Sequence, residues 1–68
     1  MIKVIDAYEG TTHLLNVSQI QEIQGPFYYQ HKAAIRLIGS QSWIKTRETI
    51  DEIDARIAEE RRSLQRNS

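Results

Sequence analysis

The sequence contains no cysteine, only one proline and three glycines in 68 residues. Without cysteine, neither a disulfide nor a thiolate metal site can stabilise the fold. A chain of about this length buries only about 60% of its unfolded surface, so its stability must come from tight packing or self-association. We therefore expect a single domain over residues 1–68 that forms a homo-oligomer.

Long apolar runs are also absent. The longest run is a few residues, far short of the roughly 20 that a membrane-spanning helix needs. The N-terminus lacks the apolar core of a secretory signal. These absences predict a cytoplasmic protein with no membrane partner, which also agrees with the lack of cysteine.

The sequence has no excess of positive or negative charge, because nine basic residues balance nine acidic ones. Zero net charge argues against a strongly non-specific nucleic-acid binder. The charges are unevenly placed, however. Residues 32–47 hold four basic side chains and no acid, residues 48–60 hold six acids and one arginine, and residues 61–66 hold three arginines. A neutral total can therefore hide a basic sheet face.

Motifs for catalysis and metal binding are missing. The only imidazoles, His13 and His31, lie in different predicted elements without a close ligand spacing, so we expect surface histidines and no metal site. No serine or threonine stands in a nucleophile motif. The glycines occur in separate turns, so none builds a phosphate-binding loop. We expect no enzyme, catalytic residue, cofactor or small-molecule substrate.

The clearest strand signal runs from Ala33 to Arg47, with a tight turn predicted at Gly39-Ser40. This turn places Ile35 opposite Ile44 and Arg36 opposite Trp43. Because side chains alternate along a strand, two faces follow. The predicted core face carries Ala33, Ile35, Leu37, Ser42, Ile44 and Thr46. The other face carries Ala34, Arg36, Ile38, Gln41, Trp43, Lys45 and Arg47.

A first hairpin is predicted from Ile2–Tyr8 and Thr11–Val17, with a turn at Glu9-Gly10. Two alternatives remain open for the next segment. Either Ser18 caps a short helical turn that places Ile20 and Ile23 on one side, or the chain is already extended by Glu22. The segment Phe27-Tyr28-Tyr29 is either a loop or the start of a strand.

Thr49 and Glu52 have the spacing of a capping box, which predicts a helix starting at Ile50. The helix is expected over about residues 50–64, with a frayed C-terminus at 65–68. Glu52 and Arg56 form a favourable i,i+4 pair. Its apolar stripe, which should pack on Ile35 and Ile44, consists of Ile50, Ile53, Ile57 and Leu64.

These elements define an α+β fold, a small antiparallel sheet of two β-hairpins over about residues 2–47, with one C-terminal amphipathic helix on one face. The order of signals resembles the small FlbD/SwrD family of bacterial flagellar accessory proteins. A looser similarity is to LytTR-type DNA-binding domains. Neither resemblance implies an enzyme. The stretches that carry the first are Met1–Val4, Gly10, Leu15–Val17, Ile20 with Ile23, Ile35 with Leu37 and Gly39, and Glu48–Ile53.

The basic sheet face around Trp43 has three interpretations. It is an interface with another subunit or protein, an ordinary solvated face with an Arg36–Trp43 cation–π pair, or a nucleic-acid surface. We favour a non-catalytic interaction or accessory module of a small bacterial or phage-like protein, homo-oligomeric through this face. The alternative is a small nucleic-acid-binding regulator using Arg36, Trp43, Lys45 and Arg47. The candidate interface residues are Arg36, Ile38, Trp43, Lys45, Arg47, Tyr28 and Tyr29.

Overall fold

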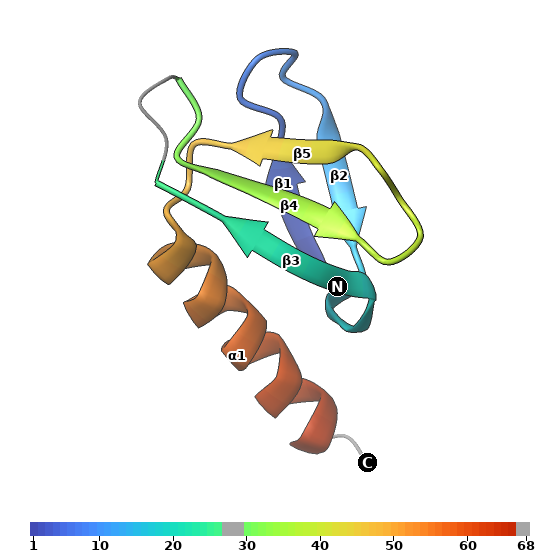
Figure 1. Cartoon of the computed structure of the whole chain (residues 1–68). Coiled ribbons are helices and arrows are strands. Elements are labelled where there is room, and N and C mark those ends of the chain that lie inside the picture. Colours follow the sequence, from blue (N-terminus) through green and yellow to red (C-terminus); the bar gives the residue numbers. More distant parts are fainter. Residues whose placement is uncertain (27–29, 67–68) are drawn as a thin grey trace.

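A computed structural model describes residues 1–26 and 30–66. Two antiparallel sheets and one C-terminal helix make up these residues, so the predicted α+β class is confirmed (Figure 1). The first sheet pairs β1 with β2, and the second has the order β3-β4-β5. The elements are β1 Ile2–Ile5, β2 Thr12–Leu15, the 3-10 turn η1 Val17–Gln19, β3 Ile20–Gln24, β4 Ala33–Leu37, β5 Trp43–Thr46 and α1 Ile50–Arg66.

The strands are divided over two sheets, whereas one sheet was expected. The backbone N–H of Ala7, just after β1, donates to the carbonyl of Lys45 in β5 at 2.8 Å. This is the one backbone hydrogen bond between the hairpin β1-β2 and β5 among the described residues. The strands cross there and diverge (Figure 1), so no continuous ladder joins the two sheets.

The predicted pairing of β4 with β5 is confirmed, since Ile35 lies opposite Ile44 and Arg36 opposite Trp43. The turn differs from the prediction. Ser40 N–H donates to the Leu37 carbonyl at 3.1 Å, which makes Ile38 and Gly39 the central turn residues. Gly39 has a φ of 82°, the value that the third position of a type II turn requires. The β4-β5 pairing ends at Arg36 and Trp43, and Leu37, the last residue of β4, pairs with Ile20 of β3.

A β-bulge decides how β3 enters the core. The register shifts between Ile20 and Glu22, so that Ile20 pairs with Leu37 while Glu22 pairs with Arg36. An extra residue in a strand reverses the alternation of faces. Ile20 and Ile23, three positions apart, therefore both pack against the core. The alternative of an extended chain at Glu22 is confirmed, because β3 begins at Ile20. The helical turn capped by Ser18, expected over Gln19 to Glu22, is wrong, because the 3-10 turn lies earlier, at Val17–Gln19, and its N-cap is Asn16, which accepts the Ser18 N–H.

The core lies between the two sheets and α1. It contains Ile53 and Ile57 of α1, as predicted, and α1 lies against β1 and η1. Leu64 is 55% exposed, because the last turns of α1 extend past the strands (Figure 1). The predicted apolar stripe therefore ends at Ile57. The remaining buried members of the core are Ile2, Val4, Leu15, Val17, Ala33 and Ile35.

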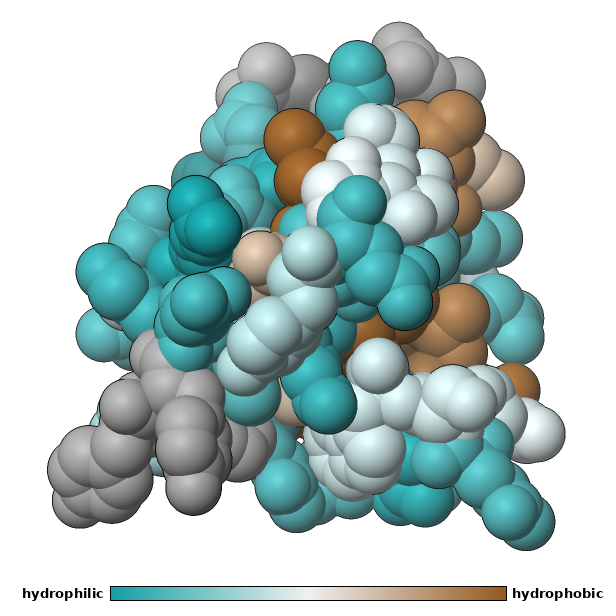
Figure 2. Space-filling view, turned by 90° about the horizontal axis from the view of Figure 1, so that it is seen from above, coloured by the Kyte–Doolittle hydropathy of each residue, from teal (hydrophilic) through white to brown (hydrophobic). Residues whose placement is uncertain are grey.

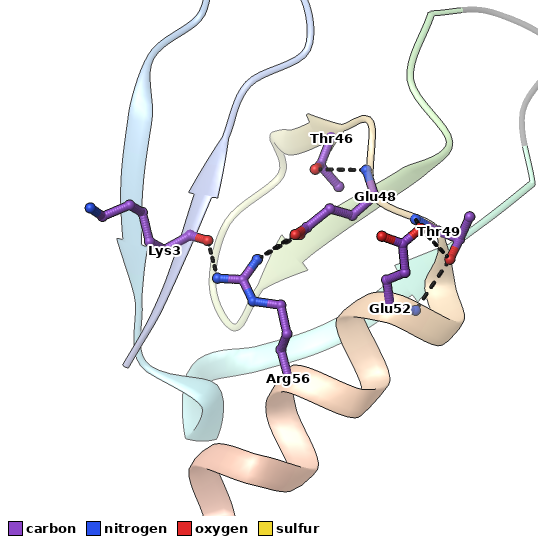
Figure 3. A network of polar contacts seen from close by, with 6 residues as sticks. All are labelled: Lys3, Thr46, Glu48, Thr49, Glu52 and Arg56. Carbon is purple, nitrogen blue, oxygen red and sulfur yellow. Dashed lines mark hydrogen bonds and ion pairs between the residues drawn. The ribbon is translucent and has the colours of Figure 1, made fainter.

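The capping box at the start of α1 is confirmed. Glu52 N–H donates to the Thr49 hydroxyl at 3.2 Å, and Thr49 N–H donates to the Glu52 carboxylate at 3.3 Å. The predicted Glu52–Arg56 pair does not form. Glu52 is held by Thr49, and the Arg56 guanidinium binds Glu48 at 2.6 and 2.7 Å and the Lys3 carbonyl instead (Figure 3).

Arg56 thus joins α1 to β1 and to the segment before the helix, and its loss has an expected cost. Replacing Arg56 by Ala should lower the free energy of unfolding by about 1–2 kcal/mol, since a two-pronged ion pair and a backbone contact are lost from a half-exposed site. Urea denaturation would measure this change. The control is Arg62→Ala, because Arg62 binds Glu59 only on an exposed helix face and should contribute less than about 0.5 kcal/mol. Equal losses for both variants would contradict a joining role for Arg56.

Candidate interaction surface

The sheet face opposite the core carries a row of three side chains across three strands. Glu22 in β3 pairs in register with Arg36 in β4, which pairs with Trp43 in β5. Side chains of directly paired residues lie on the same face of a sheet. We name this surface, together with Lys45 two residues after Trp43, the Trp43 face.

The row is held by one ion pair and one cation–π contact. Arg36 Nη2 lies 3.0 Å from a carboxylate oxygen of Glu22, and the Arg36 guanidinium carbon lies 5.3 Å from the Trp43 ring centroid. Trp43 is half-buried. The positive charge of Arg36 is thus compensated on the sheet itself, and the surface is less basic than the sequence of residues 32–47 suggests.

Tyr8 and His31 form a second cluster beside the Trp43 face. The Tyr8 hydroxyl lies 2.5 Å from His31 Nδ1, and the rings meet edge to face at 5.4 Å. Lys45 Nζ lies 5.6 Å from the Tyr8 ring centroid. His31 is buried, so the expectation of a surface histidine is wrong. Ala34 was expected on the solvated face but is also buried, since the longer side chains of its neighbours Gln24 and Lys45 flank it in register.

The structure brings together only some of the candidate interface residues. Arg36 and Trp43 touch, and Lys45 follows on the same face but reaches to Tyr8. Arg47 lies directly after β5, and its guanidinium donates to the Ala7 carbonyl at 3.4 Å. Ile38 is 59% exposed in the turn after β4. Tyr28 and Tyr29, together with Phe27, lie outside the described residues.

Sequence reasoning missed Glu22, Tyr8 and His31 as parts of this surface. The three-residue spacing of Ile20 and Ile23 in a β-rich stretch is a signal of a bulge, and the bulge turns Glu22 outward. For Tyr8 and His31, which are 23 positions apart, no local pattern predicts the contact.

The loop that carries Tyr8 is built on Asp6. Its carboxylate accepts the backbone N–H groups of Tyr8 and Glu9, both at 2.8 Å. The hydrogen bonds from the Glu9 and Tyr8 amides lower the pKa of Asp6 below its ordinary value. The charged carboxylate is thus the form that fits this loop.

This pKa shift gives a pH prediction. A carboxyl whose folded pKa is depressed stabilises the fold above its unfolded pKa, and that contribution is lost as the pH falls through the folded pKa. Asp6→Asn keeps a side-chain acceptor but has no proton to gain. The difference in melting temperature between pH 7 and pH 3 should therefore be smaller in Asp6→Asn than in the native chain. The exposed Asp54 serves as control, and an equal reduction in Asp54→Asn would contradict the assignment to Asp6.

Two other kinds of site are absent from the part of the chain that the structure describes. No three histidine, aspartate or glutamate side chains there lie close enough to form a metal site. No described helix has the length and apolar character to cross a membrane. Comparisons with protein-family models, curated proteins and solved structures find no match to this chain. The resemblance to the FlbD/SwrD family stays a prediction.

Proposed function

We propose that this chain is a non-catalytic protein-binding module of the cytoplasm that associates with a second copy of itself through the Trp43 face. The observation that carries the proposal is the half-buried Trp43 beside a charge-compensated Arg36. The core side of the sheet is occupied by α1 and the hairpin β1-β2, and Trp43 points the opposite way. Tryptophan and arginine are enriched at the centres of protein interfaces.

The Glu22–Arg36 pair favours a second copy as the partner. Across a two-fold axis the same surface meets itself, so Arg36 of one copy can face Glu22 of the other. Burying a compensated pair leaves no bare charge, whereas burying a lone arginine would cost much more. The zero net charge of the chain adds no overall repulsion between copies.

Replacement of Trp43 tests this proposal. Trp43→Ala should convert a dimer into a monomer at about 10–100 μM, because loss of one central aromatic commonly costs 2 kcal/mol or more of binding free energy. Sedimentation velocity would measure the mass. Leu14→Ala is the matched control, since Leu14 is 65% exposed on the other sheet and should leave the dimer intact. A native chain that is monomeric at about 100 μM would overturn the proposal.

A charge exchange provides a second test that leaves Trp43 in place. Arg36→Glu alone should abolish association, since two carboxylates would then meet two carboxylates across the axis. Adding Glu22→Arg should restore it, because the exchanged pair is again self-complementary. If the double variant regains the melting temperature of the native chain but not the mass of a dimer, the Glu22–Arg36 pair acts only within one copy.

A nucleic-acid-binding regulator is the second candidate, favoured by one observation. Trp43 and the 49% exposed Tyr8 flank Lys45, and single strands bind to aromatic rings interleaved with cations. Arg36 adds less to such a surface, because Glu22 already binds it. This function predicts binding to oligo-dT that weakens steeply with salt and is lost in Lys45→Glu. Absence of retention even at about 20 mM salt would exclude it.

A further inference from the structure

A groove of about 800 Å³ is lined by residues of β1, of the loop after β1 and of the segment from the end of β5 to α1. Tyr8 belongs to this lining, but Glu22, Arg36, Trp43 and Lys45 of the Trp43 face do not. The groove opens where β1 and β5 diverge after their shared hydrogen bond at Ala7, and its volume is within the range of ligand-binding clefts. Arg56, which lines the groove, reaches from α1 to the Lys3 carbonyl of β1 (Figure 3). The lining of the groove includes Lys3, Ile5, Ala7, Arg47, Glu48 and Arg56. Figure 2 shows, from above, a mainly hydrophilic surface on which hydrophobic side chains appear in a few small patches.

One wall of the groove is the free backbone edge of β1. In an antiparallel pair, alternate residues point their N–H and C=O groups to the partner strand and away from it. The Lys3 carbonyl binds Arg56, and the Ala7 N–H binds Lys45, both on the side away from β2. Ile5 stands midway between them, so its N–H and C=O point to the same edge. Within the described residues no hydrogen bond from β5 or α1 reaches them.

The side chains around this edge include one exposed apolar residue and two cations that no acidic side chain of the described residues neutralises. Ile5 is 56% exposed. Of the acidic lining residues, Glu48 is bound by Arg56 and Asp6 by the amides of its own loop. The Arg47 guanidinium has only its contact with the Ala7 carbonyl, and no described acidic side chain pairs with it or with Lys3. Among the acidic residues that line the groove, this leaves only Glu9 to balance the charges of Lys3 and Arg47.

We propose that this groove binds an extended peptide of a partner protein as an added strand along β1. The Ile5 N–H and C=O would pair with the peptide backbone, an apolar peptide side chain would contact Ile5, and a carboxylate of the peptide would bind Arg47. Strand addition obtains its affinity from main-chain hydrogen bonds and its selectivity from alternate side chains. The occupant is therefore an extended segment that alternates apolar and acidic residues. This site is separate from the Trp43 face and does not depend on the self-association proposed above.

The first test uses two synthetic peptides, TVEVEVT and TVKVKVT, both blocked at their ends and labelled with fluorescein. Titration of the full-length protein, followed by anisotropy, should show binding of the acidic peptide at least about fivefold tighter than the basic one, since the exposed cations attract one and repel the other. In the same titration followed by ¹⁵N NMR, the Ile5 amide should shift. No binding of the acidic peptide up to about 1 mM, or equal binding of both, would overturn the proposal.

N-methylation of the acidic peptide tests the strand pairing itself. Alternate amides of a bound strand face β1, and the others face solvent. N-methylation of the amides that face β1 should abolish binding. N-methylation of the amides that face solvent should leave the affinity within about twofold. Equal effects of the two sets would exclude strand addition and leave only an electrostatic attraction.

Variants locate the peptide on the molecule. Arg47→Gln should weaken the acidic peptide by about threefold to tenfold, as expected for one partly exposed ion pair. Arg62→Gln, at the far end of α1, is the matched control and should have no effect. Trp43→Ala should also leave peptide binding unchanged. Loss of peptide binding in Trp43→Ala would assign the peptide to the Trp43 face and overturn the groove as its site, whatever the oligomeric state.

Discussion

Ile53→Ala should leave the protein largely unfolded at about 37 °C or lower its melting temperature by tens of degrees. Ile53 is fully buried at the centre of the core, and truncating a buried isoleucine to alanine costs about 2–5 kcal/mol. Small domains have about 5 kcal/mol or somewhat more in total. In a chain of this length each kcal/mol corresponds to about 4–8 °C. Circular dichroism at 222 nm against temperature would measure the loss.

Leu64→Ala is the matched control for Ile53→Ala, because it shortens an apolar side chain on the same helix. Leu64 is 55% exposed, so its truncation should change the free energy of unfolding by less than about 0.5 kcal/mol. Ile53→Val should fall between the two, at about 0.5–1.5 kcal/mol. Similar melting curves for Ile53→Ala and Leu64→Ala would show that the buried face of α1 is assigned wrongly.

Gly25→Ala should destabilise the protein by about 1–3 kcal/mol, the range found when extra atoms are forced into a packed site. A Cβ at this position would lie 2.6 Å from the backbone carbonyl oxygen of Lys32 and 3.3 Å from two side-chain carbons of Ile50. A backbone oxygen cannot swing aside as the end of a flexible side chain does. The loop between β3 and β4 must therefore move, and urea denaturation would measure the cost.

Gly39→Asn is the control that separates the steric cost of an added Cβ from the cost of losing the backbone freedom of glycine. Gly39 has a positive φ, but a Cβ added there would meet no other atom within 4 Å, and asparagine tolerates this conformation. Its replacement should cost less than about 1 kcal/mol. Ile50→Val should not rescue Gly25→Ala, because the nearest contact is with Lys32. A full rescue would show that Ile50 alone limits the space at Gly25.

The start of α1 and the pairing of β4 with β5 could be predicted because both depend on neighbouring residues. The Thr49–Glu52 box closes within one helical turn, and the pairing of Arg36 with Trp43 follows from a short connection that includes Gly39. The turn itself was predicted one residue too late, since a glycine is compatible with more than one position of a tight turn.

The candidate surface could be predicted only as far as one hairpin extends. Arg36 and Trp43 were placed on one face by alternation alone. The neutralisation of Arg36 by Glu22 was not predicted, because it requires β3 to carry a bulge and to pair with β4. The turning of Arg47 to Ala7 was not predicted either, since it depends on where the first hairpin crosses β5.

By itself, the sequence determined the local elements of this protein: the first hairpin, the pairing of the central strands, the helix start and the apolar positions Ile53 and Ile57. The tertiary structure alone decided that the strands form two sheets, that His31 is buried against Tyr8, and that a groove opens beside β1. The physical reason is the distance along the sequence over which each interaction acts. Capping and alternation act over a few residues, whereas the contacts of Ala7 with Lys45 and of Arg56 with Lys3 join segments about 40–50 residues apart, for which a single sequence holds no local signal.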